Sequence, residues 1–171
     1  MDIPSWNEYF MQMCNVVKLR SRDPKKQVGS ILVSDDNRII STGYNALKKG
    51  SNDNIDWDNR DLVHLLVLHA EVNCLLYATS RFENTTLYST LSPCNHCIKL
   101  IASSGVKKII YQDKYKDYDS VKEICNFYEI DLIQFNKNNE SNENTIPIHK
   151  LEYIKLEDSD SDMDSFSDDR L

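Results

Sequence analysis

The spacing of apolar residues near the start of the chain predicts a helix followed by a hairpin. Apolar side chains recur every three or four residues over 5–20, as in an amphipathic helix, and Ser5 is a suitable N-cap. Residues 28–33 and 38–42 are short β-rich runs, and the polar residues 35–37 between them indicate a turn. We therefore expect the first helix to pack on a sheet that contains this hairpin.

The rest of the pattern alternates strands with helices. We expect helices over 69–79, 95–104 and 120–128, and strands over 86–89, 108–111 and 130–135. Gly105 directly follows the second of these helices, where a C-cap requires a left-handed residue. Strands that alternate with helices of about ten residues predict an α/β sandwich around a central sheet.

Length and composition divide the chain into one folded domain and a C-terminal extension. A chain of 171 residues is long enough for one ordinary domain. The asparagine-rich run 136–145 lacks the apolar surface that would offset the entropy of ordering it, so we expect the domain to cover 1–135 and this run to be a linker. Residues 146–156 alternate well enough for an added edge strand or a docking segment, and disorder is expected from 157.

The charge is concentrated at the C-terminal end. Residues 157–171 contain seven acidic residues and one arginine, a net of −6 of the chain's −7, so residues 1–156 carry only −1. A protein that binds nucleic acid through its phosphates needs clustered basic residues, so this balance favours a small ligand over nucleic acid. No apolar run approaches the roughly 20 residues that cross a bilayer, and the start of the chain lacks a secretory pattern. We expect no membrane partner and a cytoplasmic location.

Two short motifs contain the residues of a candidate metal site. His69 and Glu71 begin one predicted helix, and Cys94 and Cys97 begin another. Two thiolates and a neutral imidazole suit zinc, and three protein ligands leave one coordination position open for water, as in catalytic sites. Glu71 is expected to lie beside the metal, where a carboxylate can transfer protons.

Other interpretations of the cysteines have to be weighed. The C-x-x-C pair alone is also typical of a redox dithiol or of half a structural zinc site. The chain shows no export signal, so disulfides are not expected. Cys14, Cys74 and Cys125 have no partner at short spacing, and core packing is their default interpretation. The upstream His-x-Glu and the proline before Cys94 together favour catalytic zinc, because H-x-E…P-C-x-x-C is the signature of zinc deaminases.

Several further motifs give the chain a resemblance to the deoxycytidylate (dCMP) deaminase family of the cytidine deaminase superfamily, over about residues 5–135. In chain order these are W-N-E-Y-F-M from Trp6, R-S-R-D-P from Arg20, Q-V-G from Gln27, G-Y-N from Gly43, the two zinc motifs, and D-K-Y from Asp113. The resemblance implies a three-layer α/β/α sandwich with a central mixed sheet of about five strands. It also implies a zinc-dependent hydrolase that converts dCMP to dUMP and ammonia, feeding dTMP synthesis.

The resemblance assigns further residues to the substrate. It implies that Arg20 contacts the 5′-phosphate, that Asn45 contacts the sugar or base, and that Tyr115 packs beside the nucleotide. A guanidinium suits bidentate phosphate recognition, and Arg20 lies in the densest basic cluster of the body. A solvated basic loop, a turn asparagine and a packing tyrosine are the alternative interpretations of these three residues.

The resemblance also implies regulation and assembly, with some departures. Family members respond to dCTP and dTTP, for which Mg²⁺ would accompany the regulatory nucleotide, and they often form homo-oligomers such as hexamers. Here Ala46 replaces a common glycine, and residues 48–53 resemble the regulatory loop only loosely. Some members hold a second zinc before the H-A-E motif, where this chain has His64 and no cysteine, so His64 is expected to be buried or partly buried.

Two other functions use the same fold. A deaminase that edits a base in RNA or DNA would share the zinc chemistry, but it should show a basic channel that the charge balance disfavours. A catalytically silent regulatory module would have no need for the proton-transferring Glu71. The sequence therefore favours a dCMP deaminase.

Overall fold

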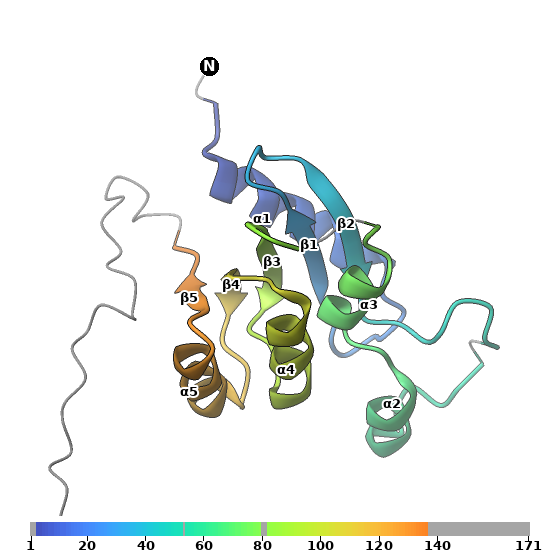
Figure 1. The fold of residues 1–171 in the computed structure, drawn as a ribbon. Helices are drawn as coiled ribbons and strands as arrows, with labels where there is room; N and C mark the ends of the chain where they lie inside the picture. The colour runs from blue at the N-terminus through green and yellow to red at the C-terminus, as the bar shows by residue number, and fades with distance from the viewer. Residues whose placement is uncertain (1–2, 53, 80–81, 137–171) are drawn as a thin grey trace, which may run out of the picture.

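Five strands form a single sheet in the order β2-β1-β3-β4-β5 (Figure 1). This computed structural model describes residues 3–52, 54–79 and 82–136. The strands are β1 (Gly29–Val33), β2 (Ile39–Tyr44), β3 (Thr86–Leu91), β4 (Lys108–Asp113) and β5 (Asp131–Gln134). The helices are α1 (Trp6–Val17), the 3₁₀ helix η1 (Lys18–Arg20), α2 (Arg60–Leu66), α3 (Ala70–Leu76), α4 (Asn95–Ser104) and α5 (Tyr118–Phe127).

The sheet is mixed because its two halves are connected differently. β1 runs antiparallel to both β2 and β3, whereas β3, β4 and β5 are parallel. A tight turn joins β1 to β2, and Asn37 in this turn has a φ of 62°, a conformation that asparagine tolerates. The parallel strands need longer crossovers, which α4 and α5 provide. The observed sheet confirms the predicted α/β class and its five mixed strands.

Helices lie on both faces of the sheet, which gives the three layers (Figure 1). On one face, α1 packs Phe10, Met11 and Cys14 against Ile31 and neighbouring strand residues. On the other, α3, α4 and α5 cover a larger cluster of apolar side chains. The cysteines without a motif, Cys14, Cys74 and Cys125, are free thiols buried in these cores, which confirms their expected packing role.

Two strand glycines allow helices to approach the sheet closely. A Cβ on Gly29 would lie 2.2 Å from the carbonyl oxygen of Cys14 in α1. A Cβ on Gly43 would lie 2.3 Å from the carbonyl oxygen of Ala70 and from the amide nitrogen of Cys74, both in α3. Because these glycines have no side chain, α1 can pack directly on β1 and α3 can pack directly on β2.

The observed elements differ from the predicted ones at several ends. The first helix stops at Val17 and tightens into η1, and the helix expected over 69–79 covers only Ala70–Leu76. α2 was not predicted: it is a short helix of which only Val63 is buried, so it shows little periodicity. No helix in the described ranges is long and apolar enough to cross a membrane. The predicted linker, 136–145, and extension, 146–171, lie outside the described residues except for Asn136.

Candidate active site

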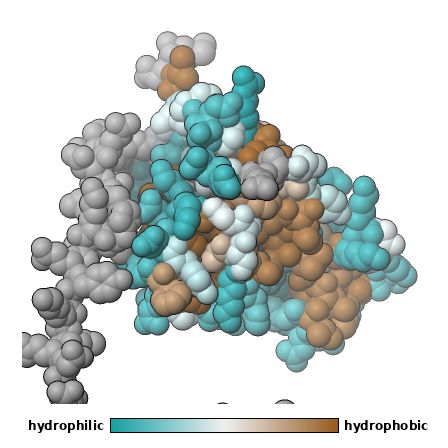
Figure 2. Space-filling view, in the orientation of Figure 1, coloured by the Kyte–Doolittle hydropathy of each residue, from teal (hydrophilic) through white to brown (hydrophobic). Residues whose placement is uncertain are grey.

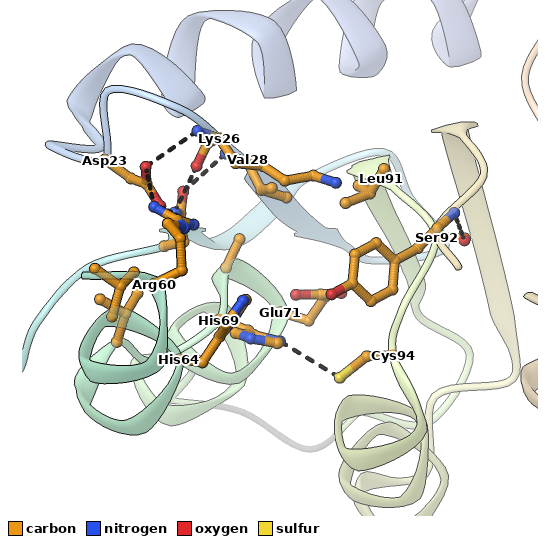
Figure 3. A pocket seen from close by; sticks show the side chains of 15 residues that line it. Asp23, Lys26, Val28, Arg60, His64, His69, Glu71, Leu91, Ser92 and Cys94 are labelled. Carbon is orange, nitrogen blue, oxygen red and sulfur yellow. Dashed lines mark hydrogen bonds and ion pairs between the residues drawn. The ribbon is translucent and has the colours of Figure 1, made fainter. Parts of the chain in front are cut away.

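A pocket at the carboxyl end of β3 brings both predicted motifs together (Figure 3). Its enclosed volume is about 70 Å³, and the rest of the pocket is open to solvent. His69, Ala70 and Glu71 form part of its wall at the beginning of α3, and Ser92 and Cys94 form another part before α4. The remaining wall comes from the loop after η1, Asn45, α2 and Tyr115.

Three side chains are arranged to hold a metal ion. The Nδ1 atom of His69 lies 3.4 Å from the Sγ of Cys94 and 3.3 Å from the Sγ of Cys97, and all three atoms lie within 4.8 Å of one another. Zinc–sulfur and zinc–nitrogen bonds in a tetrahedral site place sulfur and nitrogen about 3.5 Å apart. The donor set, with two thiols and one imidazole, fits a zinc ion with a position left for water.

Local structure explains why these side chains converge. His69 is the N-cap of α3 and Cys94 is the N-cap of α4, and both have extended backbone conformations. Cys97 lies one turn into α4, so its thiol is on the same side as that of Cys94. The predicted placement of both motifs at helix starts is therefore confirmed.

The protonation of the three groups is linked. Hydrogen bonding from Cys97 lowers the pKa of Cys94 to about 3 against the effect of partial burial, and His69 assists through its hydrogen bond and charge. The same contact with Cys94, together with burial, raises the pKa of Cys97. The hydrogen bond to Cys94 also raises the pKa of His69. One thiolate is thus already favoured, and a metal ion would displace the remaining proton.

Glu71 lies in the first turn of α3 with only 4% of its surface exposed, and it lines the pocket beside the three candidate ligands (Figure 3). Burial raises the pKa of Glu71 to about 7, and the opposite charge of His69 only partly offsets this rise. A carboxyl group that titrates near neutral pH can both accept and donate a proton, which is the requirement for general acid–base chemistry.

Asn45 fastens the loop that forms one wall of the pocket. Its Oδ1 accepts a hydrogen bond of 2.8 Å from the backbone N–H of Val28, and its Nδ2 donates one of 2.8 Å to the carbonyl oxygen of Lys26. The hydroxyl of Ser21 donates to the carbonyl oxygen of Asn45. The buried Asn45 side chain therefore holds the loop and also lines the pocket.

Charged residues to which the sequence analysis assigned no role form the side of the pocket away from the candidate ligands (Figure 3). Asp23 accepts two hydrogen bonds of 3.0 Å from Arg60 on α2. Burial alone would raise the pKa of Asp23, but the bonds from Arg60 and from two backbone N–H groups outweigh it and lower that pKa. Lys26 places its Nζ 4.7 Å from the ring centroid of Tyr115. No single motif contains these residues. The R-S-R-D-P motif, which includes Asp23, was the one sequence feature that pointed to this wall.

The structure brings together most of the predicted site residues. His69, Glu71, Cys94, Asn45 and Tyr115 line the pocket, and Cys97 completes the metal trio behind it. Arg20 is exposed at the end of η1 and is not among the residues that line the pocket.

The expectation for His64 is wrong. This residue is exposed on α2 and lines the pocket, because α2 buries only Val63 and stands away from the sheet.

Comparisons with known proteins agree with this geometry. The model of the family described as "Cytidine and deoxycytidylate deaminase zinc-binding region" matches residues 4–113. A deoxycytidylate deaminase of Homo sapiens is 37% identical over 126 residues, covering 69% of this chain and 71% of that protein. One of Pongo abelii is 34% identical over 144 residues, covering 80% of this chain and 81% of its own.

A solved structure shows the same fold. The dCMP deaminase of the cyanophage S-TIM5, in complex with dCMP and dUMP, superposes with a TM-score of 0.68 at 26% identity. The match covers 79% of this chain and 100% of the phage chain.

Proposed function

The chain belongs to the cytidine and deoxycytidylate deaminase zinc-binding family, and on this premise we propose that it converts dCMP to dUMP and ammonia by hydrolysis. The observation that carries the proposal is the convergence of His69, Cys94 and Cys97 beside the buried Glu71 at one pocket. The related human and phage proteins are named for the same activity, and the phage structure was solved with dCMP and dUMP.

His69, Cys94 and Cys97 would hold the zinc ion through one nitrogen and two sulfur atoms. When bound there, zinc lowers the pKa of a coordinated water toward about 7 and so makes a nucleophile available at neutral pH. The open side of the trio faces the pocket, because His69 and Cys94 both line it. Cys97, at 1% exposure, closes the opposite side against the core.

Glu71 is the proton carrier of the proposed reaction. Its carboxylate takes the proton of the attacking water and delivers it to N3 of the cytosine ring as the new bond forms at C4. It then takes the proton of the new hydroxyl group on C4 and passes it to the departing amino group, so that one water and one cytosine give one uracil and one ammonia. A pKa raised by burial suits Glu71 to both halves of this transfer.

The phosphate of dCMP would occupy the basic side of the pocket. Lys26 and Arg60 line that side, and Asp23 fixes the guanidinium so that little of its freedom is lost when an anion binds. Tyr115 packs beside the bound nucleotide, with its backbone N–H held by Ser92 at 2.8 Å. Asn45 holds the adjoining wall. Arg20 remains the residue that family resemblance assigns to the phosphate, and the kinetics of an Arg20→Ala variant test that assignment.

The test is a panel of cytidine, deoxycytidine, CMP, dCMP and single-stranded DNA assayed with the purified protein. We expect ammonia release and a dominant kcat/KM for dCMP. Equal activity on deoxycytidine would refute recognition of the phosphate, and preference for single-stranded DNA would favour a base editor. Binding of dCMP without turnover would instead favour a silent regulatory module.

We also propose that nucleotides regulate the enzyme and that it is cytoplasmic. dCTP with Mg²⁺ would activate the enzyme and dTTP would inhibit it, and the enzyme would act in the cytoplasm. Addition of each nucleotide to the dCMP assay, with and without Mg²⁺, tests the regulation.

We propose a homo-oligomer, hexameric by family resemblance, and the hydrophobic surface over α2 and α3 supports association (Figure 2). The side chains of Leu65, Leu66 and Leu76 are 79%, 44% and 66% exposed there. Exposed apolar patches of this kind mark interaction sites. Light scattering of the purified full chain would measure the oligomeric state.

A further inference from the structure

A groove lies on the sheet face that α1 covers, beside that helix. Its walls include Trp6 of α1, Lys108 of β4 and Ile133 of β5, and it extends to Phe135 and Asn136 at the end of the described chain. Its volume is about 1210 Å³. Sites for small ligands usually enclose roughly 300–1,000 Å³, so this groove is suited to a peptide segment.

The groove exists because the two faces of the sheet are covered unequally. α3, α4 and α5 lie on one face, while α1 alone lies on the other and packs mainly on β1 and β3. Among the described residues α1 is the one helix on this face, and it reaches β4 but leaves β5 largely uncovered (Figure 1). Ile133 and Phe135 are therefore only partly buried, and Trp6 is 57% exposed.

The chain itself leads into this groove. Asn136, the last described residue, is part of the groove wall, and residues 137–171 follow it. The run 146–156 contains the apolar residues Ile146, Ile148, Leu151, Tyr153, Ile154 and Leu156. The nine residues 137–145 could span up to about 30 Å when extended, which is ample for the run to return to the sheet.

Charge is complementary along the same path. Lys107 and Lys108 line the groove, and the acidic residues 157–171 directly follow the apolar run. Asp35 and Asp131 also line it, and the run itself carries Lys150 and Lys155. A segment in the groove would thus find opposite charges on both sides.

We propose that residues 146–156 dock in the groove beside α1, with their apolar side chains on Trp6, Ile133 and Phe135, and so complete the second covering layer of the sheet. Docking within one chain is favoured over capture of a separate protein, because the tether keeps the segment at high effective concentration.

Three forms of the protein test the proposal by hydrogen exchange: the full chain, a chain ending at Leu156, and a chain ending at Thr145. Loss of residues 146–171 should speed exchange of the β5 amides by roughly tenfold or more. Loss of 157–171 alone should change it far less. The double variant Leu151→Asp and Ile154→Asp should reproduce the effect of removing residues 146–171. Asn142→Asp with Asn144→Asp, which adds the same two charges in the linker, is the matched control.

A photo-crosslinking residue in place of Leu151 locates the segment directly. Mixing isotope-labelled and unlabelled chains then distinguishes links within a chain from links between chains. Links to Trp6, Ile133 or Phe135 within one chain support the proposal. Links to another surface, links only between chains, or β5 exchange unchanged by removal of 146–171 would each overturn it.

Discussion

Asp23 accepts two hydrogen bonds of 3.0 Å from Arg60, from Nη1 to Oδ1 and from Nη2 to Oδ2. Asp23 is 2% exposed, and the same carboxylate accepts the backbone N–H groups of Lys25 and Lys26. The pair therefore fixes a loop of the pocket wall to α2, which makes few other contacts with the core. This pair gives the basic side of the pocket its shape.

Replacing Asp23 by asparagine should loosen this wall. We expect Asp23→Asn to lower the free energy of unfolding by about 2–3 kcal/mol at pH 7, because charge-assisted hydrogen bonds are lost. The pKa of Asp23 is lowered in the folded state, so its contribution is present above the unfolded pKa and is lost as pH falls through the folded one. Urea unfolding at pH 7 and in steps below pH 4 should show the difference between the two proteins shrinking in acid. A constant difference would contradict this role.

Replacing Lys26 by alanine should reduce recognition of the phosphate. We expect kcat/KM for dCMP to fall about tenfold to hundredfold, chiefly through KM, with little change for deoxycytidine. Lys25→Ala is the matched control, since Lys25 pairs with Asp58 and is not among the pocket-lining residues. Steady-state kinetics of Arg20→Ala in the same series decide between the two basic residues. If only Arg20→Ala raises KM, the phosphate is not bound where we propose.

Replacing Glu71 should separate catalysis from metal binding. Glu71→Gln keeps the shape of the side chain but cannot carry a proton, so turnover should fall by about 10²- to 10⁴-fold. Zinc content, measured by metal analysis, should stay near one ion per chain, because Glu71 is not one of the three converging donors. Loss of zinc together with activity would show that Glu71 is a ligand instead.

Removing zinc should make the thiol of Cys94 accessible to reagents. Cys94 lines the pocket and is 6% exposed, whereas Cys97 and the three cysteines outside the metal trio are at most 1% exposed. Burial raises the pKa of Cys74 to about 11 and that of Cys125 to about 12, which further suppresses their reactivity. Titration of the native protein with a thiol reagent before and after chelation should therefore show one additional reactive group, Cys94. An unchanged count would argue against the assigned ligands.

Adding a methyl group at Gly43 should displace the helix that begins at the metal site. Its Cβ would fall 2.3 Å from backbone atoms of Ala70 and Cys74, so α3 has to move. We expect Gly43→Ala to destabilise the protein by about 1–3 kcal/mol and to weaken zinc retention. Thr42→Ala, at the exposed neighbouring position of β2, is the control. Thermal unfolding and metal analysis measure both effects, and identical behaviour of the two variants would disprove the close contact.

The metal site could be predicted from the sequence because its parts are local. His69 and Glu71 are two residues apart, and Cys94 and Cys97 are one helical turn apart, so helix geometry alone orients each pair. Proline before Cys94 and glycine after Ser104 mark the ends of α4 equally locally. The sequence thus determined the fold class, the donor set and the proton carrier we propose.

The walls of the pocket depended on tertiary structure. Asp23 and Arg60 are 37 residues apart, and Lys26 meets Tyr115 from a different part of the chain. Neither pair follows a helical or strand period, so no pattern could join them. Folding also left Arg20 outside the pocket lining and brought His64 into it. The sequence by itself determined which residues could hold a metal and move a proton, because those residues share short elements; only the packing of loops and α2 around the sheet decided which charges line the pocket.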